Sequence, residues 1–223
     1  MLHTPRSIPL RAIAVPWILI TIIAASPGAA AAQEPEPIPF FVVDLHGLTT
    51  RFPDDDPQLA ASRGLALEEL PNRGFGGDIA VHVFPFRYRA VTFGLGGRLI
   101  SVGASKNQDS QTLGLRPVTE RFTYLGPQLS FNFGTESGWS YLSGGISVSR
   151  WSVAVDGPPL AGPDVERLKT LDYGGGARWF AKRHLAFSFD VRFYAINPST
   201  PVNGLPAGPR TRLFVFGAGV SVK

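Results

Sequence analysis

The chain has 223 residues, of which 44% are hydrophobic, 11% aromatic and only 17% charged, and it contains no cysteine. Leu, Val, Ile and Phe are too frequent for a disordered chain. The absence of cysteine excludes a disulfide framework, a thiolate zinc site and a cysteine nucleophile. Without Arg6 and Arg11, which fall in a predicted export signal, the 21 basic residues become 19 against 17 acidic ones. This near-neutral balance does not favour binding of nucleic acid.

Residues 1–32 are predicted to form a cleavable signal peptide. Arg6 and Arg11 precede an apolar run at residues 12–25, and small residues follow at 29–32. A basic segment, an apolar run and a small-residue cleavage site are the three parts of an export signal. A membrane anchor is the alternative, but a helix that spans the bilayer needs about 20 apolar residues, more than this run provides.

Residues 33–38 are predicted to be an extended leader, and residues 39–223 one all-β domain. Within 185–195, apolar residues such as Phe187 and Phe189 alternate with small or polar ones, and this period of two is typical of a strand. Eight segments show the same alternation: 39–52, 75–86, 90–103, 119–133, 139–155, 169–180, 185–195 and 211–222.

Short and long connections alternate between these segments. The short ones are 87–89, 134–138 and 181–184, and the long ones are 53–74, 104–118, 156–168 and 197–210. All long connections of an up-and-down meander then leave from one end, which is the asymmetry of outer-membrane barrels. The sequence therefore predicts an eight-stranded antiparallel up-and-down transmembrane β-barrel, with its long connections outside the cell and its short turns in the periplasm.

A secreted, soluble, lipocalin-like barrel is a competing interpretation, in which the apolar face would line the interior. The polar face of the strands carries small residues with isolated charges, as in Gly94, Gly96 and Arg98, and the whole chain has only four lysines. A water-facing surface would carry many Lys and Glu residues. The composition therefore favours an apolar face that meets lipid.

Aromatic residues gather near the strand ends, where a membrane barrel meets the two interfaces of the bilayer. One girdle, at the short-turn end, is predicted from Phe84, Phe86, Tyr88, Phe131, Phe133, Trp139, Tyr141, Trp179 and Phe180. Phe122, Tyr124, Trp151 and Tyr194 are predicted to supply the other girdle.

Three stretches, Asn72–Gly97, Leu125–Gly134 and Tyr173–Tyr194, resemble the bacterial outer membrane protein β-barrel domain family of small OmpA-like, porin-like barrels. The resemblance covers nearly all of residues 39–223, and its motifs mark strands and turns rather than an active site. It implies a monomer in the cell outer membrane, in contact with outer-membrane lipid and lipopolysaccharide, that the barrel-assembly machinery inserts. The chain departs from the family pattern at Lys223, where an aromatic residue is common, and at Pro127, which predicts a bulge or bend inside a strand.

The strand parity places nine polar residues inside the barrel. This predicted lumenal network consists of Asp44, His46, Asp78, His82, Arg98, Asp172, Arg178, Asp190 and Arg192. Two His and two Asp on the first two strands could bind a metal or act as an acid-base pair, but a hydrogen-bonded barrel interior is the preferred interpretation. Pairing lumenal with lumenal residues sets Asp78 opposite Arg98 and Asp172 opposite Arg192, which predicts a ladder of ion pairs.

Other candidate sites are weaker. Asp54, Asp55 and Asp56 could coordinate Ca²⁺ or bridge lipopolysaccharide through divalent ions, but a solvated loop is the simpler interpretation. The His-x-Ser pair of barrels that deacylate lipid A is absent, because no histidine is followed two residues later by serine. We therefore expect no catalytic, metal or cofactor site.

The sequence predicts a non-enzymatic outer-membrane barrel with a narrow or plugged lumen and a role in envelope structure or surface interaction. A small porin or transporter for small or apolar solutes is the first alternative, although eight strands leave little room for an aqueous channel. The soluble lipocalin-like barrel is the second.

Overall fold

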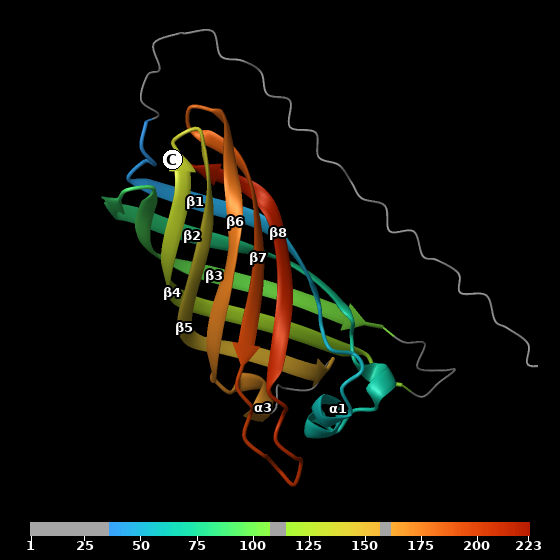
Figure 1. Cartoon of the computed structure of the whole chain (residues 1–223). Coiled ribbons are helices and arrows are strands. Elements are labelled where there is room, and N and C mark those ends of the chain that lie inside the picture. Colours follow the sequence, from blue (N-terminus) through green and yellow to red (C-terminus); the bar gives the residue numbers. More distant parts are fainter. Residues whose placement is uncertain (1–35, 108–114, 157–161) are drawn as a thin grey trace, which may run out of the picture. The chain divides into compact units, whose positions relative to one another are not determined.

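Eight antiparallel strands close into a barrel in chain order (Figure 1). The computed structural model describes residues 36–107, 115–156 and 162–223, so the predicted signal peptide and residues 33–35 of the leader lie outside the described residues. The strands are β1 (Phe41–Arg51), β2 (Arg73–Tyr88), β3 (Val91–Lys106), β4 (Val118–Thr135), β5 (Gly138–Val155), β6 (Leu168–Lys182), β7 (Leu185–Ile196) and β8 (Thr211–Val222). Pairing of β1 with β8 closes the barrel and confirms the predicted fold class.

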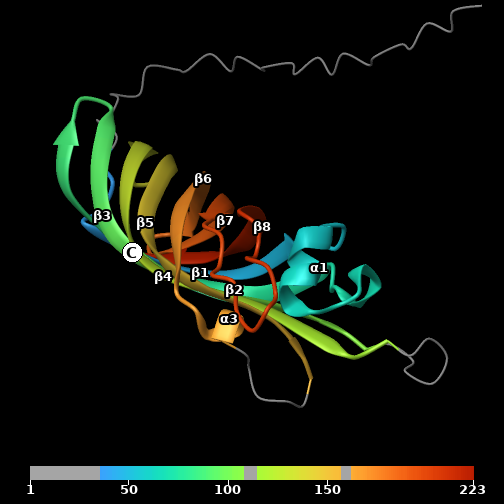
Figure 2. The ribbon, with the colours of Figure 1, turned by 90° about the horizontal axis from the view of Figure 1, so that it is seen from below.

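Long and short connections alternate as predicted, and this defines a turn end and a loop end of the barrel. Only Arg89–Ala90, Glu136–Ser137 and Arg183–His184 separate the strands at the turn end. At the loop end, the first connection contains helix α1 (Pro57–Arg63) and the short 3₁₀ helix η1 (Leu67–Glu69), and the third contains α3 (Gly162–Val165). Both α1 and α3 lie at the end of the barrel opposite the C-terminus (Figures 1 and 2). No helix among the described residues is long and apolar enough to cross a membrane.

The predicted register of two hairpins is wrong by two residues. Asp78 pairs with Ile100, and Arg98 with Ala80. In the other hairpin Arg192 pairs with Gly174 rather than with Asp172. The physical reason is that the two-residue turns, Arg89–Ala90 and Arg183–His184, lie farther along the chain than the centres of the predicted connections 87–89 and 181–184, and that each ladder contains a one-residue irregularity beside its turn.

The outer face of the strands is apolar. Leu142 and Phe187, for example, are 60% and 67% exposed, and Leu95, Leu99, Leu129, Phe131, Ile146, Leu171 and Phe216 face outward in the same way. So extensive an exposed apolar surface is exceptional for a soluble monomer. It is the arrangement expected of a barrel wall in contact with lipid.

The interior is filled in three layers. The loop-end cluster combines Phe52, Leu59 and Leu70 of the first connection with Ile100, Phe122, Tyr124, Trp151, Tyr194 and Leu213 of the strands, all buried. The turn-end cluster consists of Ile38, Val42, Phe84 and Trp139, with Phe180 packed against it. Charged residues lie between the two clusters.

These clusters correct the predicted girdles. Phe122, Tyr124, Trp151 and Tyr194 are at most 3% exposed and belong to the loop-end cluster, so they form no outer girdle. At the turn end, Phe84, Trp139 and Tyr141 are also buried, whereas Phe86, Tyr88, Phe131, Phe133 and Trp179 face outward as predicted. Side-chain direction follows the pleat of the strand, and closeness to a strand end does not override it.

Pro127 interrupts the ladder between β4 and β5. Pairing holds at Leu125 with Val148 and resumes at Leu129 with Gly144, and the positions between them are unpaired. The register is the same on both sides, so no residue is inserted, and of the predicted bulge or bend the bulge is absent. Proline has no N–H to donate, which accounts for the missing bonds.

Candidate functional site

All nine residues of the predicted lumenal network are buried inside the barrel, between the loop-end and turn-end clusters. They are Asp44 and His46 on β1, Asp78 and His82 on β2, Arg98 on β3, Asp172 and Arg178 on β6, and Asp190 and Arg192 on β7. We call this middle region the polar layer. Since alternate residues of a strand point to opposite faces, these nine residues point into the lumen, while their neighbours on the same strands point outward.

Each arginine of the polar layer contacts carboxylates. Arg98 Nη1 donates to Asp78 on the neighbouring strand and, at 3.0 Å, to Asp190 Oδ1. Because Asp190 lies on β7, this second bond crosses the lumen from β3. One guanidinium therefore joins opposite walls of the barrel.

Arg178 makes the second crossing. Its Nε and Nη2 donate to the two carboxylate oxygens of Asp44 at 2.8 and 2.6 Å, a bidentate pair between β6 and β1. The Arg178 guanidinium also lies 4.0 Å from the centre of the Tyr141 ring. Bidentate geometry and stacking on an aromatic ring fix the plane of the guanidinium.

Arg192 joins two carboxylates within one wall. Its Nη1 donates to Asp172 Oδ2 at 2.9 Å, and its Nε lies 2.8 Å from Asp190 Oδ1. The pairs Asp78–Arg98 and Asp172–Arg192 thus form despite the register error, because a long arginine side chain reaches an acid displaced by two positions.

The two histidines have different surroundings. His46 Nδ1 lies 2.9 Å from Asp78 Oδ1, and its Nε2 lies 2.9 Å from Ser188 Oγ. His82 Nδ1 is 3.9 Å from Asp44 Oδ2, beyond hydrogen-bond distance. The four residues that the sequence suggested as one metal or acid-base site therefore lie as two pairs: His46 with Asp78, and His82 near Asp44.

The sequence analysis missed several polar partners of the network. Tyr124 and Gln128, both on β4, donate to the two oxygens of Asp172. Tyr141 on β5 donates to Asp190, and Ser221 on β8 donates to Asp44. Their strand parity was the available signal, because each lies an even number of residues from another inward-facing residue of its strand.

The Asp54–Asp56 run has local roles in the first long connection. Asp56 Oδ1 accepts from the backbone N–H groups of Gln58 and Leu59 at 2.9 and 3.1 Å and so caps α1. Asp54 Oδ2 accepts from Asn72 Nδ2 at 2.6 Å. Within the described ranges, no three His, Cys, Asp or Glu side chains are grouped so that they could hold a metal ion.

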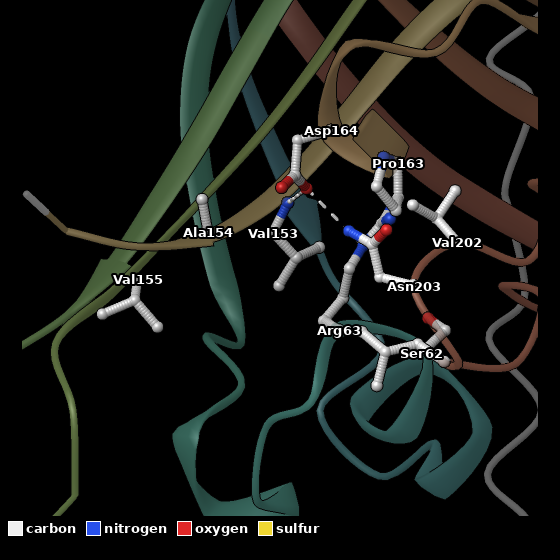
Figure 3. Close-up of a pocket in the computed structure, with 10 residues that line it drawn as sticks. Ser62, Arg63, Val153, Ala154, Val155, Pro163, Asp164, Val202 and Asn203 are labelled. Carbon is white, nitrogen blue, oxygen red and sulfur yellow. Dashed lines mark hydrogen bonds and ion pairs between the residues drawn. The ribbon is translucent and has the colours of Figure 1, made fainter. Parts of the chain in front are cut away.

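A small cavity of about 180 Å³ opens at the loop end (Figure 3). Beside it, an ion pair joins α1 to α3, and hydrogen bonds of the same two residues reach β5. Arg63 Nε lies 3.6 Å from Asp164 Oδ1, and Arg63 Nη2 donates to the backbone oxygen of Trp151 at 3.2 Å. Asp164 accepts from the backbone N–H of Val153 at 2.9 Å. Burial lowers the pKa of Arg63, while the carboxylate of Asp164 opposes that shift. These contacts attach the loop-end helices to the barrel.

A closed eight-stranded barrel with an apolar outer face and a charged, filled interior is the architecture of small outer-membrane barrel proteins. Among solved structures, the chain is similar to Neisserial surface protein A, with 15% identity, a TM-score of 0.51, and coverage of 82% of this chain and 96% of that one. It is also similar to Ail, the attachment invasion locus protein of Yersinia pestis, solved with the heparin analogue sucrose octasulfate. There the identity is 11% and the TM-score 0.46, over 81% of this chain and 97% of that one.

At these identities the likeness concerns the fold alone. A scan against protein-family models and a search of curated proteins both found no match.

Proposed function

We propose that the chain is an integral outer-membrane protein, not an enzyme, whose lumen is closed and whose long connections act in envelope structure or surface contact. In this proposal it is a monomer, its partners are outer-membrane lipid and lipopolysaccharide, and the barrel-assembly machinery inserts it. The observation that carries the proposal is the three-layered filling of the barrel, in which ion pairs cross from wall to wall between two apolar clusters.

The transverse ion pairs support a closed lumen rather than a pore. Arg178 with Asp44, and Arg98 with Asp190, join strands that are not neighbours in the sheet. An ion or solute that crossed the barrel would have to separate these pairs and then pass the loop-end cluster. Separating a buried pair leaves both charges without compensation, at a cost of about 3–5 kcal/mol.

The outer surface supports a location in the membrane rather than in solution. A lipocalin-like barrel would bury its apolar side chains inside, around a ligand. Here the polar layer fills the inside with charged residues, and large apolar residues such as Leu129 and Phe187 are 60% and 67% exposed. Lipid is the environment in which this inversion is stable.

Conductance in planar bilayers tests the closed lumen. The full chain, refolded in detergent and added to the bilayer, is expected to insert without producing steady ionic steps. Regular steps with a fixed single-channel conductance would overturn the closed lumen and favour the porin alternative. Fractionation tests the location separately, since recovery of the native chain in the soluble periplasm without detergent would contradict an outer-membrane protein.

Surface labelling tests the orientation. A tag inserted near Ser199, in the last long connection, is expected to be labelled on intact cells, and a tag near Ser137, in a short turn, is expected to be labelled only after lysis. A tag near Gln108 is predicted to behave like the one near Ser199, although Gln108 lies outside the described residues. The reverse pattern would place the long connections in the periplasm.

A further inference from the structure

The outer wall over β3, β4 and β5 carries a depression on the loop-end side of the apolar surface, beside Arg167 of the third long connection. Two adjoining cavities of about 160 and 630 Å³ share Leu125, Val148 and Arg167 as lining residues. The first is also lined by Leu99 and the second by Gly97, with Pro127 and other small residues. The groove exists because Gly97 and Pro127, which pair across β3 and β4, occupy outward positions between the leucine pairs Leu95–Leu129 and Leu99–Leu125.

The floor of this groove is apolar and its loop-end rim is basic. Arg150 and Arg167 both line it, and both are exposed. Neither makes an ion pair within the described residues. Glu166, the nearest acid in sequence, accepts instead from the backbone N–H and hydroxyl of Thr200 at 3.0 and 3.2 Å.

The positive charge continues along this side of the barrel. Lys169 and Arg210 line a neighbouring cavity of about 260 Å³ together with Ile146 and Leu171. Arg121 and Arg212 are exposed near the loop ends of β4 and β8. In the described strands the acidic residues point into the barrel, so no acid on the outer wall offsets these charges.

We infer that this groove binds one phosphorylated lipid, with an acyl chain against Leu99, Leu125 and Val148 and a headgroup phosphate between Arg150 and Arg167. Guanidinium groups bind phosphate through paired charge-assisted hydrogen bonds. Basic residues directly beyond an apolar wall lie at the depth of lipid headgroups. The inference rests on the proposed function, since this wall meets lipid only if the barrel spans the membrane.

A groove that is apolar at one end and dibasic at the other selects for an amphiphile. A free phosphate would gain the two arginines but leave the apolar floor uncovered. A neutral lipid would cover the floor but leave the arginines without a counter-charge. A lipid that carries a phosphate uses both parts of the surface.

Native mass spectrometry of the refolded full chain, released from neutral detergent, tests the inference with lipid A as probe. Wild-type barrels are expected to retain one lipid A, and the double variant Arg150→Gln/Arg167→Gln to need at least about tenfold more lipid for equal occupancy, because each charge-assisted contact contributes about a factor of ten. The matched control is Arg87→Gln/Arg183→Gln, which removes two exposed charges at the turn end and should change the requirement less than about twofold.

A second variant tests the apolar floor without changing charge. Gly97→Leu would fill the groove, and an added Cβ there meets only the backbone oxygen of Gly126, at an ordinary 3.6 Å. Its control is Gly47→Leu on β1, where an added Cβ meets only the backbone oxygen of Ala218 at 3.9 Å. Gly97→Leu is expected to weaken retention of lipid A, and Gly47→Leu to leave it unchanged.

Specific outcomes would overturn the lipid groove. These are equal weakening by the turn-end control, no weakening by either groove variant, equal retention of diacylglycerol, which has acyl chains but no phosphate, or displacement of lipid A by millimolar inorganic phosphate. A heat-modifiable gel shift shows that each variant is folded before its lipid is counted. Failure of the proposed function would appear elsewhere, as native protein in the soluble fraction or as channel conductance, while the refolded barrel could still be assayed for lipid.

Discussion

The polar layer and the loop-end cluster fill neighbouring parts of the same barrel through opposite physical means. Arg178 and Arg192 in the polar layer and Phe122 and Tyr194 in the loop-end cluster are all at most 1% exposed. In the loop-end cluster, burial itself is favourable, at about 25 cal/mol per Å² of apolar surface. In the polar layer, burial is costly and only mutual pairing offsets it.

The comparison shows that two kinds of contact inside the lumen stabilise a barrel whose outer face meets lipid. The apolar outer surface gains little from folding against other protein, so the filled lumen supplies the contacts between distant strands. The contacts of the loop-end cluster do not fix how the strands are placed relative to one another, because apolar side chains pack in many ways. The hydrogen bonds of the polar layer are directional, and the bidentate pair of Arg178 with Asp44 therefore fixes β6 relative to β1.

The largest effect is expected from isolating a charge in the polar layer. Arg178→Met removes the guanidinium and leaves Asp44 buried with only Ser221 as a hydrogen-bond donor and His82 nearby. The variant should lower the free energy of unfolding by about 3–5 kcal/mol. Urea unfolding of the barrel in lipid vesicles, followed by tryptophan fluorescence, measures the change.

A double-mutant cycle separates charge isolation from lost packing. Asp44→Asn/Arg178→Met should be more stable than Arg178→Met alone, because no uncompensated charge remains inside. Strictly additive losses would show that the pair does not couple β6 to β1. The exposed Arg121→Met is the matched control for the side-chain change and is expected to alter stability by less than about 0.5 kcal/mol.

A cavity in the loop-end cluster should cost less and act locally. Leu59 on α1 is 1% exposed and packs in the cluster, so Leu59→Ala removes three buried carbons. Because α1 belongs to a connection and can shift toward the cavity, we expect a loss of about 2–3 kcal/mol, the low end for such changes. Leu59→Ala should also speed proteolysis of the first connection. A barrel that instead opened to ions would show that this cluster alone seals the lumen.

Loss of the cap of α1 tests the first connection by itself, because Asp56 is not part of the polar layer or the loop-end cluster. Asp56→Ala deletes the acceptor for the N–H groups of Gln58 and Leu59, at an expected cost of about 1 kcal/mol. Amide hydrogen exchange should accelerate in α1 and stay unchanged in β6 and β7. Asp55→Ala, an exposed neighbour, is the control. Equal acceleration in both variants would mean that the cap does not hold the helix.

Strand number, topology and the inward direction of Asp44, Arg98 and Arg178 were predictable because they depend only on period-two alternation and connection lengths. Register was not, since it depends on turns and ladder irregularities that alternation does not encode. The loop-end cluster was missed for a different reason. Phe122 and Tyr124 share the parity of inward-facing Gln128, and this parity, rather than their position near a strand end, decides that they point into the barrel. Which acid each arginine contacts depends on distances across the lumen, and a strand pattern does not contain them.

The smallest effect concerns pH and the ion pair of Glu69 with Arg116, which belongs to the connections beside the loop-end cluster. Hydrogen bonds from the Arg116 side chain hold the pKa of Glu69 at about 2, below its ordinary value of 4.5, and Glu69 in turn raises the pKa of Arg116. Because the folded pKa is the lower one, the pair stabilises the connection fully above pH 4.5, and this contribution is lost as the pH falls toward 2. Amide exchange of Ala66, whose N–H donates to Glu69 Oε2 at 2.8 Å, should therefore accelerate between pH 4.5 and 2 relative to amides in β7. Glu69→Gln should remove this pH dependence, whereas Glu68→Gln should keep it, and a Glu69→Gln profile that matched wild type would assign the dependence to another group.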